Sequence, residues 1–149
     1  MRLLLRGALA GIAGTAAMTL HQRLRQGPSS GGAPSWDEAS APAQVARLAL
    51  RRVGADPPAE RIPLLTNAMH WLYGTTWGVG YALLAADADE EPWAGPAFGL
   101  LVWALSYVQL VPLGIYEPPW EYAPSELADD VGYHVTYGTA TALAHRALR

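Results

Sequence analysis

Cysteine and lysine are both absent from this chain of 149 residues. Without cysteine there is no disulfide framework, no thiolate zinc site and no cysteine nucleophile. All ten basic residues are therefore arginines, and against thirteen acidic residues they give a net charge of −3. Such a balance leaves no concentrated cationic surface for DNA or RNA, so we expect no nucleic-acid partner.

Charge of either sign is scarce as well, and it is unevenly spread. Charged residues make up 15% of the chain, where a soluble domain carries about 25%. None of them falls within residues 62–86 or within residues 92–116. Each stretch is long enough to cross a hydrocarbon core of about 30 Å as a helix, at about 1.5 Å per residue. The sequence therefore predicts membrane-spanning helices over about 63–86 and 93–116.

Two further apolar segments lie at the ends of the chain. Residues 3–22 are rich in small apolar side chains but contain Arg6, and residues 127–148 hold a long uncharged stretch after two aspartates. A cleaved signal peptide is the alternative for the first segment, and an amphipathic surface helix is the alternative for the second. We favour four membrane-spanning helices in one membrane domain, residues 1–149. A soluble, alanine-rich helical protein also remains open, because the mean hydropathy is only +0.09.

Residues 23–62 form a polar connector between the first two predicted spans. It starts with a stretch rich in glycine, proline and serine, which has no means of packing. Residues 44–53 then place apolar side chains on one face of a helix and polar side chains on the other, which predicts an amphipathic helix that ends at Gly54. This helix would lie at the membrane interface or cap the bundle. The predicted fold class is thus an all-α integral membrane bundle with a short amphipathic helix in its first connector.

Small residues recur at helical spacing in the predicted spans. In lipid there is little hydrophobic drive between helices, so close contact depends on small side chains at four-residue intervals. We predict that these glycine faces pack the helices together within the bilayer, and that an oligomer of identical chains forms through them. The glycines concerned are Gly7, Gly11, Gly74, Gly78, Gly95, Gly99 and Gly138.

Polar residues within the spans are expected to gather at one depth. Four antiparallel crossings place the first and third connectors on the same side of the membrane. Counted from that side, His70, Gln109 and His134 lie about six or seven residues deep, roughly 10 Å below the face. Asp130 precedes His134 by four residues, which stacks a carboxylate beside an imidazole. His21 lies at the same face, so the sequence predicts a polar layer of these five side chains.

Three roles remain open for the polar layer. Polar side chains in a membrane can simply hydrogen-bond helices together. A carboxylate–imidazole pair can instead relay protons in a transport function. His70, His134 and Asp130 are also candidate ligands for a divalent metal, and two facing histidines can hold a haem.

No catalytic motif accompanies these residues. The chain lacks H-E-x-x-H, G-x-S-x-G and the phosphate-binding G-x-x-x-x-G-K pattern. We therefore expect no catalytic residues, no enzymatic activity and no bound cofactor.

Proline shapes the third connector. Pro112 lacks a backbone N–H and leaves the carbonyl of Val108 without its helical partner, so we expect the third span to kink or unwind there. The connector that follows is aromatic and acidic. It is interpreted as a rigid turn anchored by interfacial aromatics, with an acidic mouth that attracts cations as the alternative.

Residues 63–148 resemble a known family through several motifs. These are the histidine-led aromatic and glycine-rich stretch 70–81, the Trp-x-Gly at 93–95, the Pro-Leu-Gly at 112–114, the pair Pro118 and Pro119, and Asp130 four residues before His134. Together they resemble the YagU-type small inner-membrane proteins of bacteria. The resemblance implies a multi-pass protein of the bacterial plasma membrane with a link to acid resistance, and hence a role in envelope or pH-stress physiology. It also implies that Asp130 corresponds to the acid of that family's motif, and His70 and His134 to its two histidines. The family has a longer connector after the first helix, which contains cysteines, whereas this chain has none.

Overall fold

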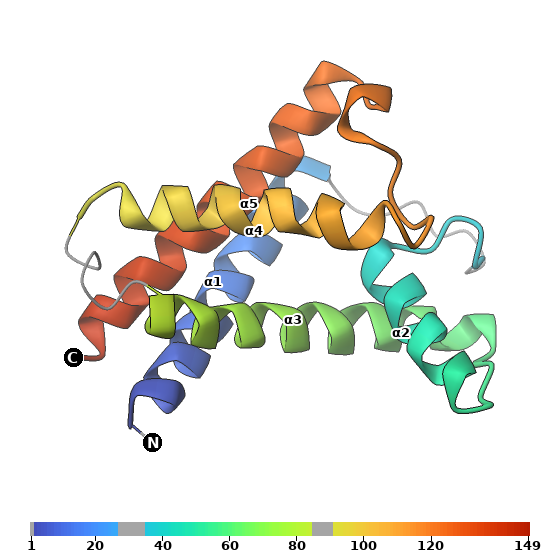
Figure 1. Cartoon of the computed structure of the whole chain (residues 1–149), viewed down its shortest axis with the longest axis horizontal. Helices are drawn as coiled ribbons and strands as arrows, with labels where there is room; N and C mark the ends of the chain where they lie inside the picture. Colours follow the sequence, from blue (N-terminus) through green and yellow to red (C-terminus); the bar gives the residue numbers. More distant parts are fainter. Residues whose placement is uncertain (1, 27–34, 85–90) are drawn as a thin grey trace.

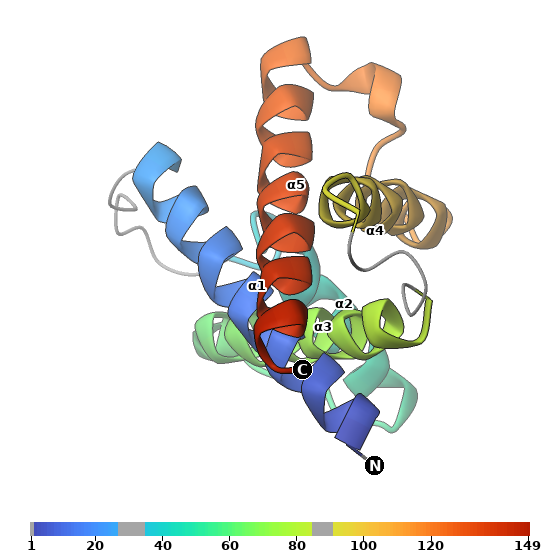
Figure 2. The ribbon, with the colours of Figure 1, turned by 90° about the vertical axis from the view of Figure 1, so that its left-hand side faces the viewer.

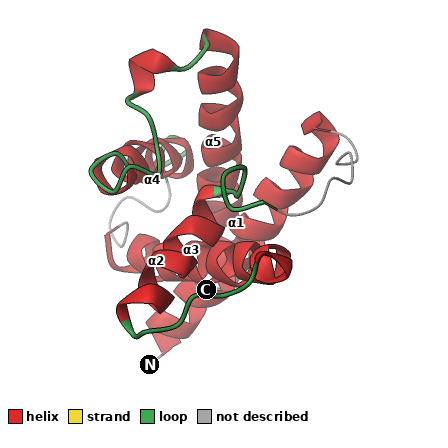
Figure 3. Cartoon of the chain, turned by 90° about the vertical axis from the view of Figure 1, so that its right-hand side faces the viewer, coloured by secondary structure: helices red, strands yellow, loops and turns green. Residues whose placement is uncertain are grey.

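The computed structural model describes residues 2–26, 35–84 and 91–149, and these residues form helices joined by turns (Figure 1). The α-helices are α1 (Arg2–Gln26), α2 (Ala41–Arg52), α3 (Ile62–Leu84), α4 (Ala94–Leu110) and α5 (Pro124–Ala147). Two short 3-10 helices, η1 (Ala59–Arg61) and η2 (Pro119–Glu121), precede α3 and α5. No strand occurs in the described residues (Figure 3). The all-α prediction is confirmed, with the four long helices where the apolar segments lie.

One predicted helix is shorter than expected. We predicted a third span over 93–116, but α4 ends at Leu110, and the unwinding expected near Pro112 is present. After it the chain turns through Gly114, whose φ of +66° is a left-handed conformation that favours glycine. The amides of Ile115 and Tyr116 then donate to the Leu110 carbonyl at 3.0 and 3.3 Å. These bonds satisfy the end of the helix and fix the turn.

The amphipathic helix of the first connector begins earlier than predicted, at Ala41, because Pro42 fits the first helical turn. Its far end is fixed to the following loop. Arg47 and Arg51 both bind the Asp56 carboxylate, at 2.9 and 2.7 Å. Hydrogen bonds from Arg51 and Arg47 hold the pKa of that carboxyl well below its usual range. Arg47 also stacks over the Trp36 ring, 4.4 Å from its centre.

The long helices cross one another in two pairs that share an extensive contact. α1 crosses α3 and α5 crosses α4 (Figures 1 and 2), while α1 packs on α5 as extensively as α5 packs on α4, and α2 packs against α3. Both termini lie at one end of the bundle in Figure 1, and α2 and the loop carrying η2 lie at the other. The first and third connectors are therefore at the same end.

Glycine allows each of these close approaches. A Cβ added at Gly11 of α1 would lie 2.5 Å from the Gly74 carbonyl oxygen and 2.8 Å from the Gly78 Cα of α3. A Cβ added at Gly95 of α4 would lie 2.8 Å from the Thr139 Cα of α5. All seven glycines predicted to pack helices meet a neighbouring helix in this way: Gly7, Gly11, Gly74, Gly78, Gly95, Gly99 and Gly138. These faces are occupied by helices of the same chain, and the oligomer stays a prediction.

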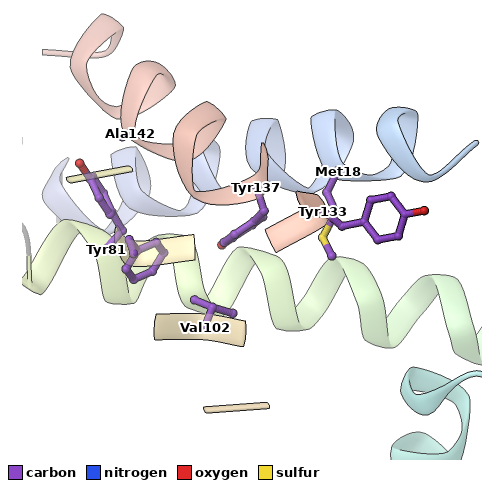
Figure 4. Packing of buried hydrophobic residues seen from close by; sticks show 7 residues of the cluster. Met18, Tyr81, Val102, Tyr133, Tyr137 and Ala142 are labelled. Atoms are coloured by element: carbon purple, nitrogen blue, oxygen red, sulfur yellow. The ribbon is translucent and has the colours of Figure 1, made fainter. Parts of the chain in front are cut away.

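The buried core is aromatic and small rather than aliphatic. Tyr81 and Phe98 meet edge to face with ring centres 5.0 Å apart, and Trp77 meets Phe98 similarly at 6.1 Å. Figure 4 shows members of this cluster lying between the helices. Its buried members are Met18, Tyr81, Phe98, Val102, Tyr133, Tyr137 and Ala142.

Length and mean hydropathy single out one helix of the described residues as able to cross a membrane. It is α1, over Arg2–Arg25, whereas α4 is apolar but only 17 residues long. A signal sequence or the core helix of a soluble protein meets the same test. The arrangement of side chains around the bundle therefore bears on the location of the protein more than the hydropathy of any one helix.

The glycine contacts can be tested with a matched pair of variants in α3. Gly78→Ala places a methyl group against the α1 backbone at Gly11, so we expect a loss of about 1–3 kcal/mol of unfolding free energy. Gly80→Ala, on the same helix, meets only the Trp77 ring at an ordinary 3.5 Å and serves as the control. Unfolding of the detergent-solubilised protein, followed by circular dichroism, measures both. Equal stability of the two variants would contradict the close α1–α3 contact.

Candidate functional site

A cavity of about 260 Å³ lies in the half of the bundle nearest the first and third connectors. It is bounded by the C-terminal halves of α1 and α4, the N-terminal halves of α3 and α5, the start of α2, and the turn after α4. Its walls are mostly apolar, with a small number of polar groups. Lining residues are Thr15, Met18, Gln22, Ala41, Pro42, Val45, Met69, His70, Tyr73, Gly74, Trp77, Val102, Ser106, Gln109, Leu110, Leu113, Tyr116, Asp130, His134 and Tyr137.

Four of the five residues of the predicted polar layer line this cavity. His70 comes from α3, Gln109 from α4, and Asp130 and His134 from α5. Residues separated by up to about sixty positions in the sequence are thus brought around one space, at the end of the bundle from which their depth was counted. What role the layer plays is a separate matter and stays a prediction.

His21 does not belong to this group. Its Nδ1 lies 2.8 Å from the Thr136 hydroxyl, and its ring meets Tyr133 edge to face with centres 5.0 Å apart. The depth estimate for His21 ignored rotation about the α1 axis. The cavity face of α1 carries Thr15, Met18 and Gln22, at spacings of three and four residues, and His21 lies off this face, toward α5.

Asp130 is the centre of the hydrogen bonding at the cavity. Its Oδ2 accepts from the Trp103 indole N–H at 2.9 Å and from the Tyr107 hydroxyl at 3.4 Å. Its Oδ1 lies 3.3 Å from His134 Nδ1, across the four-residue spacing that the sequence predicted. Three donors therefore surround one carboxylate whose side chain is 28% exposed.

The two cavity histidines each have one nitrogen engaged. His134 Nδ1 lies 2.8 Å from the Asp130 carbonyl oxygen, so this nitrogen carries the proton and Nε2 presents a lone pair. His70 Nε2 lies 3.3 Å from the Thr19 hydroxyl, which itself donates to the Thr15 carbonyl at 2.8 Å. His70 is then the donor at Nε2, and its Nδ1 is left as an acceptor.

Gln109 links α4 to α3 at the rim. Its Nε2 donates to the Tyr73 hydroxyl at 3.3 Å and to the Leu105 carbonyl at 3.0 Å. The side chain is exposed, so Gln109 borders the cavity rather than its deepest part.

Trp103 and Tyr107 were not singled out from the sequence, although they hold Asp130. A signal was present: the two residues are four apart and so share one face of α4, and buried indole and phenol groups need hydrogen-bond partners. Which carboxylate they reach depends on how α4 packs on α5. The sequence does not contain that information in any local pattern.

A second polar contact lies at the opposite end of the bundle. Arg6 Nε donates to the His145 carbonyl at 2.7 Å, and Arg6 Nη2 lies 3.0 Å from His145 Nδ1. The His145 ring also meets Tyr81 edge to face, with centres 5.4 Å apart. An arginine near the C-terminal end of α5 is favourably placed for the helix dipole, which explains how α1 accommodates Arg6.

The metal and haem alternatives find no support in the geometry. In the parts of the chain that the structure describes, no three His, Asp or Glu side chains lie close enough together to hold a metal ion, so His70, His134 and Asp130 do not form a three-ligand site. The cavity volume of about 260 Å³ lies below that of sites for drug-sized ligands, about 300–1,000 Å³.

Removing one donor tests the network at Asp130. Trp103→Phe keeps an aromatic ring on α4 but deletes the N–H that binds the carboxylate, so we expect a loss of about 1.5–3 kcal/mol of unfolding free energy. Trp120→Phe is the matched control, because Trp120 is 79% exposed. Chemical unfolding in detergent measures both, and a neutral effect of Trp103→Phe would show that this hydrogen bond does not hold Asp130.

Comparison with known proteins gives no relative from which a site could be transferred. The resemblance of residues 63–148 to YagU-type proteins therefore stays a prediction, and the argument for function rests on the geometry of the cavity. No protein-family model, no curated protein and no solved structure matches the chain.

Proposed function

We propose that this chain is a four-span integral protein of the bacterial plasma membrane, without enzymatic activity, and that the cavity lined by His70, Gln109, Asp130 and His134 is its functional centre. In this proposal α1, α3, α4 and α5 cross the membrane, and α2 lies at the interface beside the turn that follows α4. The role is placed in envelope or pH-stress physiology, as the resemblance of residues 63–148 to YagU-type proteins implies.

The position of leucine is the observation that carries the membrane location. Leucine is among the residue types most often buried in soluble proteins. All leucines of this chain lie in the described residues, and none of them is buried. Most are strongly exposed, on the outside of all four long helices: Leu3, Leu4, Leu5, Leu9, Leu20, Leu24, Leu64, Leu72, Leu83, Leu84, Leu100, Leu101, Leu143 and Leu148.

The interior has the opposite character. Buried polar side chains include Thr15, Ser106 and Thr141, together with His134 and His145. Glycine and alanine fill the contacts between helices. Large aliphatic side chains outside and small or polar ones inside are what a hydrocarbon solvent favours.

The exposed fraction of α1 bears on whether this helix is a membrane span, the core helix of a soluble protein or a cleaved signal peptide. The core helix of a soluble protein is mostly buried, whereas only 28% of the apolar window of α1 is buried within the bundle. A cleaved signal peptide would leave the mature protein without α1. The packing of Gly7 and Gly11 on α3 and of Gly14 on α5 supports retention of α1, because both helix pairs are joined through it.

Aromatic side chains at the bundle ends fit the same arrangement. Trp93 precedes α4 and is 59% exposed, and Trp120 in η2 is 79% exposed. Exposed tryptophans at helix ends are typical of the membrane interface. α4 itself spans about 25 Å at 1.5 Å per residue, and a short span is accommodated by local thinning of the bilayer.

Single cysteines test the membrane location directly, because the natural chain has none. Leu72→Cys and Leu143→Cys replace side chains that are 61% and 58% exposed on the bundle. We expect a polar maleimide to label both at least about tenfold more slowly in membranes than in denaturant, because thiolate formation needs water. Fast labelling of both in native membranes would mean that these faces meet water, and would overturn the proposal.

Glu38→Cys and Glu121→Cys are the matched controls, on exposed positions of the first and third connectors. Both should be labelled rapidly, and both from the same side of the membrane. If one were labelled in intact cells and the other only after permeabilisation, the four-span topology would be wrong.

A proton-linked function is the second candidate, and the contact of His134 Nδ1 with Asp130 Oδ1 at 3.3 Å favours it. Histidine changes its charge between about pH 5 and 8, and a carboxylate beside it can accept or release the same proton. Titratable side chains around this pair are His70 and Tyr73 from α3, Tyr107 from α4, Tyr116 from the following turn, and Tyr137 from α5.

Reconstituted vesicles with an internal pH dye test this second candidate after an external acid jump. We expect proton entry faster than in protein-free vesicles, and a several-fold slower entry for His134→Gln. His21→Gln is the control, since His21 lies outside the cavity and should leave the rate unchanged. Entry no faster than in protein-free vesicles would rule out the proton-linked role.

A further inference from the structure

The cavity carries one formal charge. Among the described residues that line it, Asp130 is the only aspartate, glutamate or arginine. The arginines that form ion pairs in the described residues engage other carboxylates: Arg25 pairs with Asp129, and Arg47 and Arg51 pair with Asp56. Asp130 is held instead by the indole, phenol and imidazole of Trp103, Tyr107 and His134. Indole and phenol donors stabilise a carboxylate without cancelling its charge.

Five other polar atoms at the cavity are acceptors. Thr15 donates its hydroxyl proton to the Gly11 carbonyl at 2.8 Å, Ser106 donates to the Trp103 carbonyl at 2.7 Å, and Tyr137 donates to the Gly74 carbonyl at 2.6 Å. Since each proton is already committed, these oxygens offer lone pairs to the cavity. His70 Nδ1 and His134 Nε2 do the same, because the other nitrogen of each ring is the donor. A ligand that brings donors pairs with these five atoms, while the Gln22 amide and the Tyr73 hydroxyl at the same cavity carry protons of their own.

The remaining walls of the cavity are apolar and aromatic, and they suit an apolar ring system in a ligand. Met18, Met69 and Val102 supply adaptable aliphatic surface, and Trp77 and Tyr73 supply aromatic surface. Aromatic rings also attract cations through their faces. A cavity of about 260 Å³ lies just below the range of about 300–1,000 Å³ for drug-sized ligands, so a ligand smaller than these suits it, such as a fused pair of small rings with one polar substituent.

We propose that the cavity binds a small lipophilic primary ammonium ion, with its apolar ring body among Met18, Met69 and Trp77 and its N–H donors directed at Asp130 and the neighbouring acceptors. The ammonium supplies Asp130 with a cationic partner, which no arginine provides, and brings up to three donors for the carboxylate and the acceptors beside it. The inference rests on the cavity being the functional centre, as proposed above, and gives that centre a class of ligand. It does not depend on the membrane location, because binding is measured in detergent.

A pair of probes that differ in charge tests the assignment. 2-Naphthylmethylammonium and its neutral analogue 2-naphthylmethanol share one ring system, and equilibrium dialysis measures the binding of each. With the full chain in a neutral detergent, we expect the ammonium to bind at least about tenfold more tightly than the alcohol, in keeping with a charge-assisted contact. Binding is compared with that to empty detergent micelles, so that partition into the micelle is subtracted.

Two adjacent aspartates provide the matched variants. Asp130→Asn should abolish the preference for the ammonium over the alcohol, while Asp129→Asn should keep it, because Asp129 pairs with Arg25 and does not line the cavity. Circular dichroism and size exclusion establish that both variants fold. Should Asp130→Asn fail to fold, the comparison of the two probes on the natural chain still decides, because equal affinity would contradict the ammonium assignment.

The possible outcomes distinguish the ammonium assignment from the broader proposal that the cavity is the functional centre. Equal affinity of the two probes for the natural chain, or a charge preference that persists in Asp130→Asn, would overturn the ammonium assignment while keeping the cavity as a binding site. Binding of both probes that does not exceed that to empty micelles would overturn the ammonium assignment, and the proton-linked role of Asp130 and His134 would then be decided by the vesicle experiment alone.

Discussion

Close backbone approach at glycine is the constraint on which the rest of this structure depends. Gly11 and Gly78 let α1 and α3 touch along their backbones, and Gly95 and Gly138 do the same for α4 and α5. Gly14 then brings α1 against Tyr137 and Thr141 of α5, which joins the two pairs. Through these contacts α3 packs on α1 and α4 packs on α5. The cavity forms among the four helices, at the end of the bundle that carries the first and third connectors. The position of the cavity is therefore a consequence of where the glycines are.

Glycine contacts also explain why the large aliphatic side chains lie on the outside of the bundle. When backbones approach closely, little volume remains between helices for leucine, and the interior is filled by Ala, Thr, Ser and a few aromatic rings. Dispersion between tightly packed small groups then does what aliphatic burial does in a soluble core. The leucines are left on the outer faces, where only an apolar solvent suits them.

Polar groups inside such a bundle are expensive unless they are paired, and the cavity shows how the pairing is achieved. The hydroxyl groups of Thr15, Ser106 and Tyr137 donate their protons to backbone carbonyls of their own or a neighbouring helix. Asp130 is held differently, because it collects donors from α4 and from its own helix without an arginine. This uncompensated carboxylate, with acceptors beside it, gives the cavity its chemical character.

The sequence by itself determined the helices and the glycine faces, because each of these follows from spacing along one helix. It also placed four polar side chains at one end of the bundle, because successive long helices run in opposite directions. The missing charges at 62–86 and 92–116 marked α3 and α4, and the turn at Pro112 was visible in the proline itself. Only the tertiary structure decided which helices pair, that Trp103 and Tyr107 reach Asp130, and that His21 turns away toward Thr136. Rotation of a helix about its axis and the choice of its partner depend on contacts between residues far apart in the chain, and no local pattern encodes them.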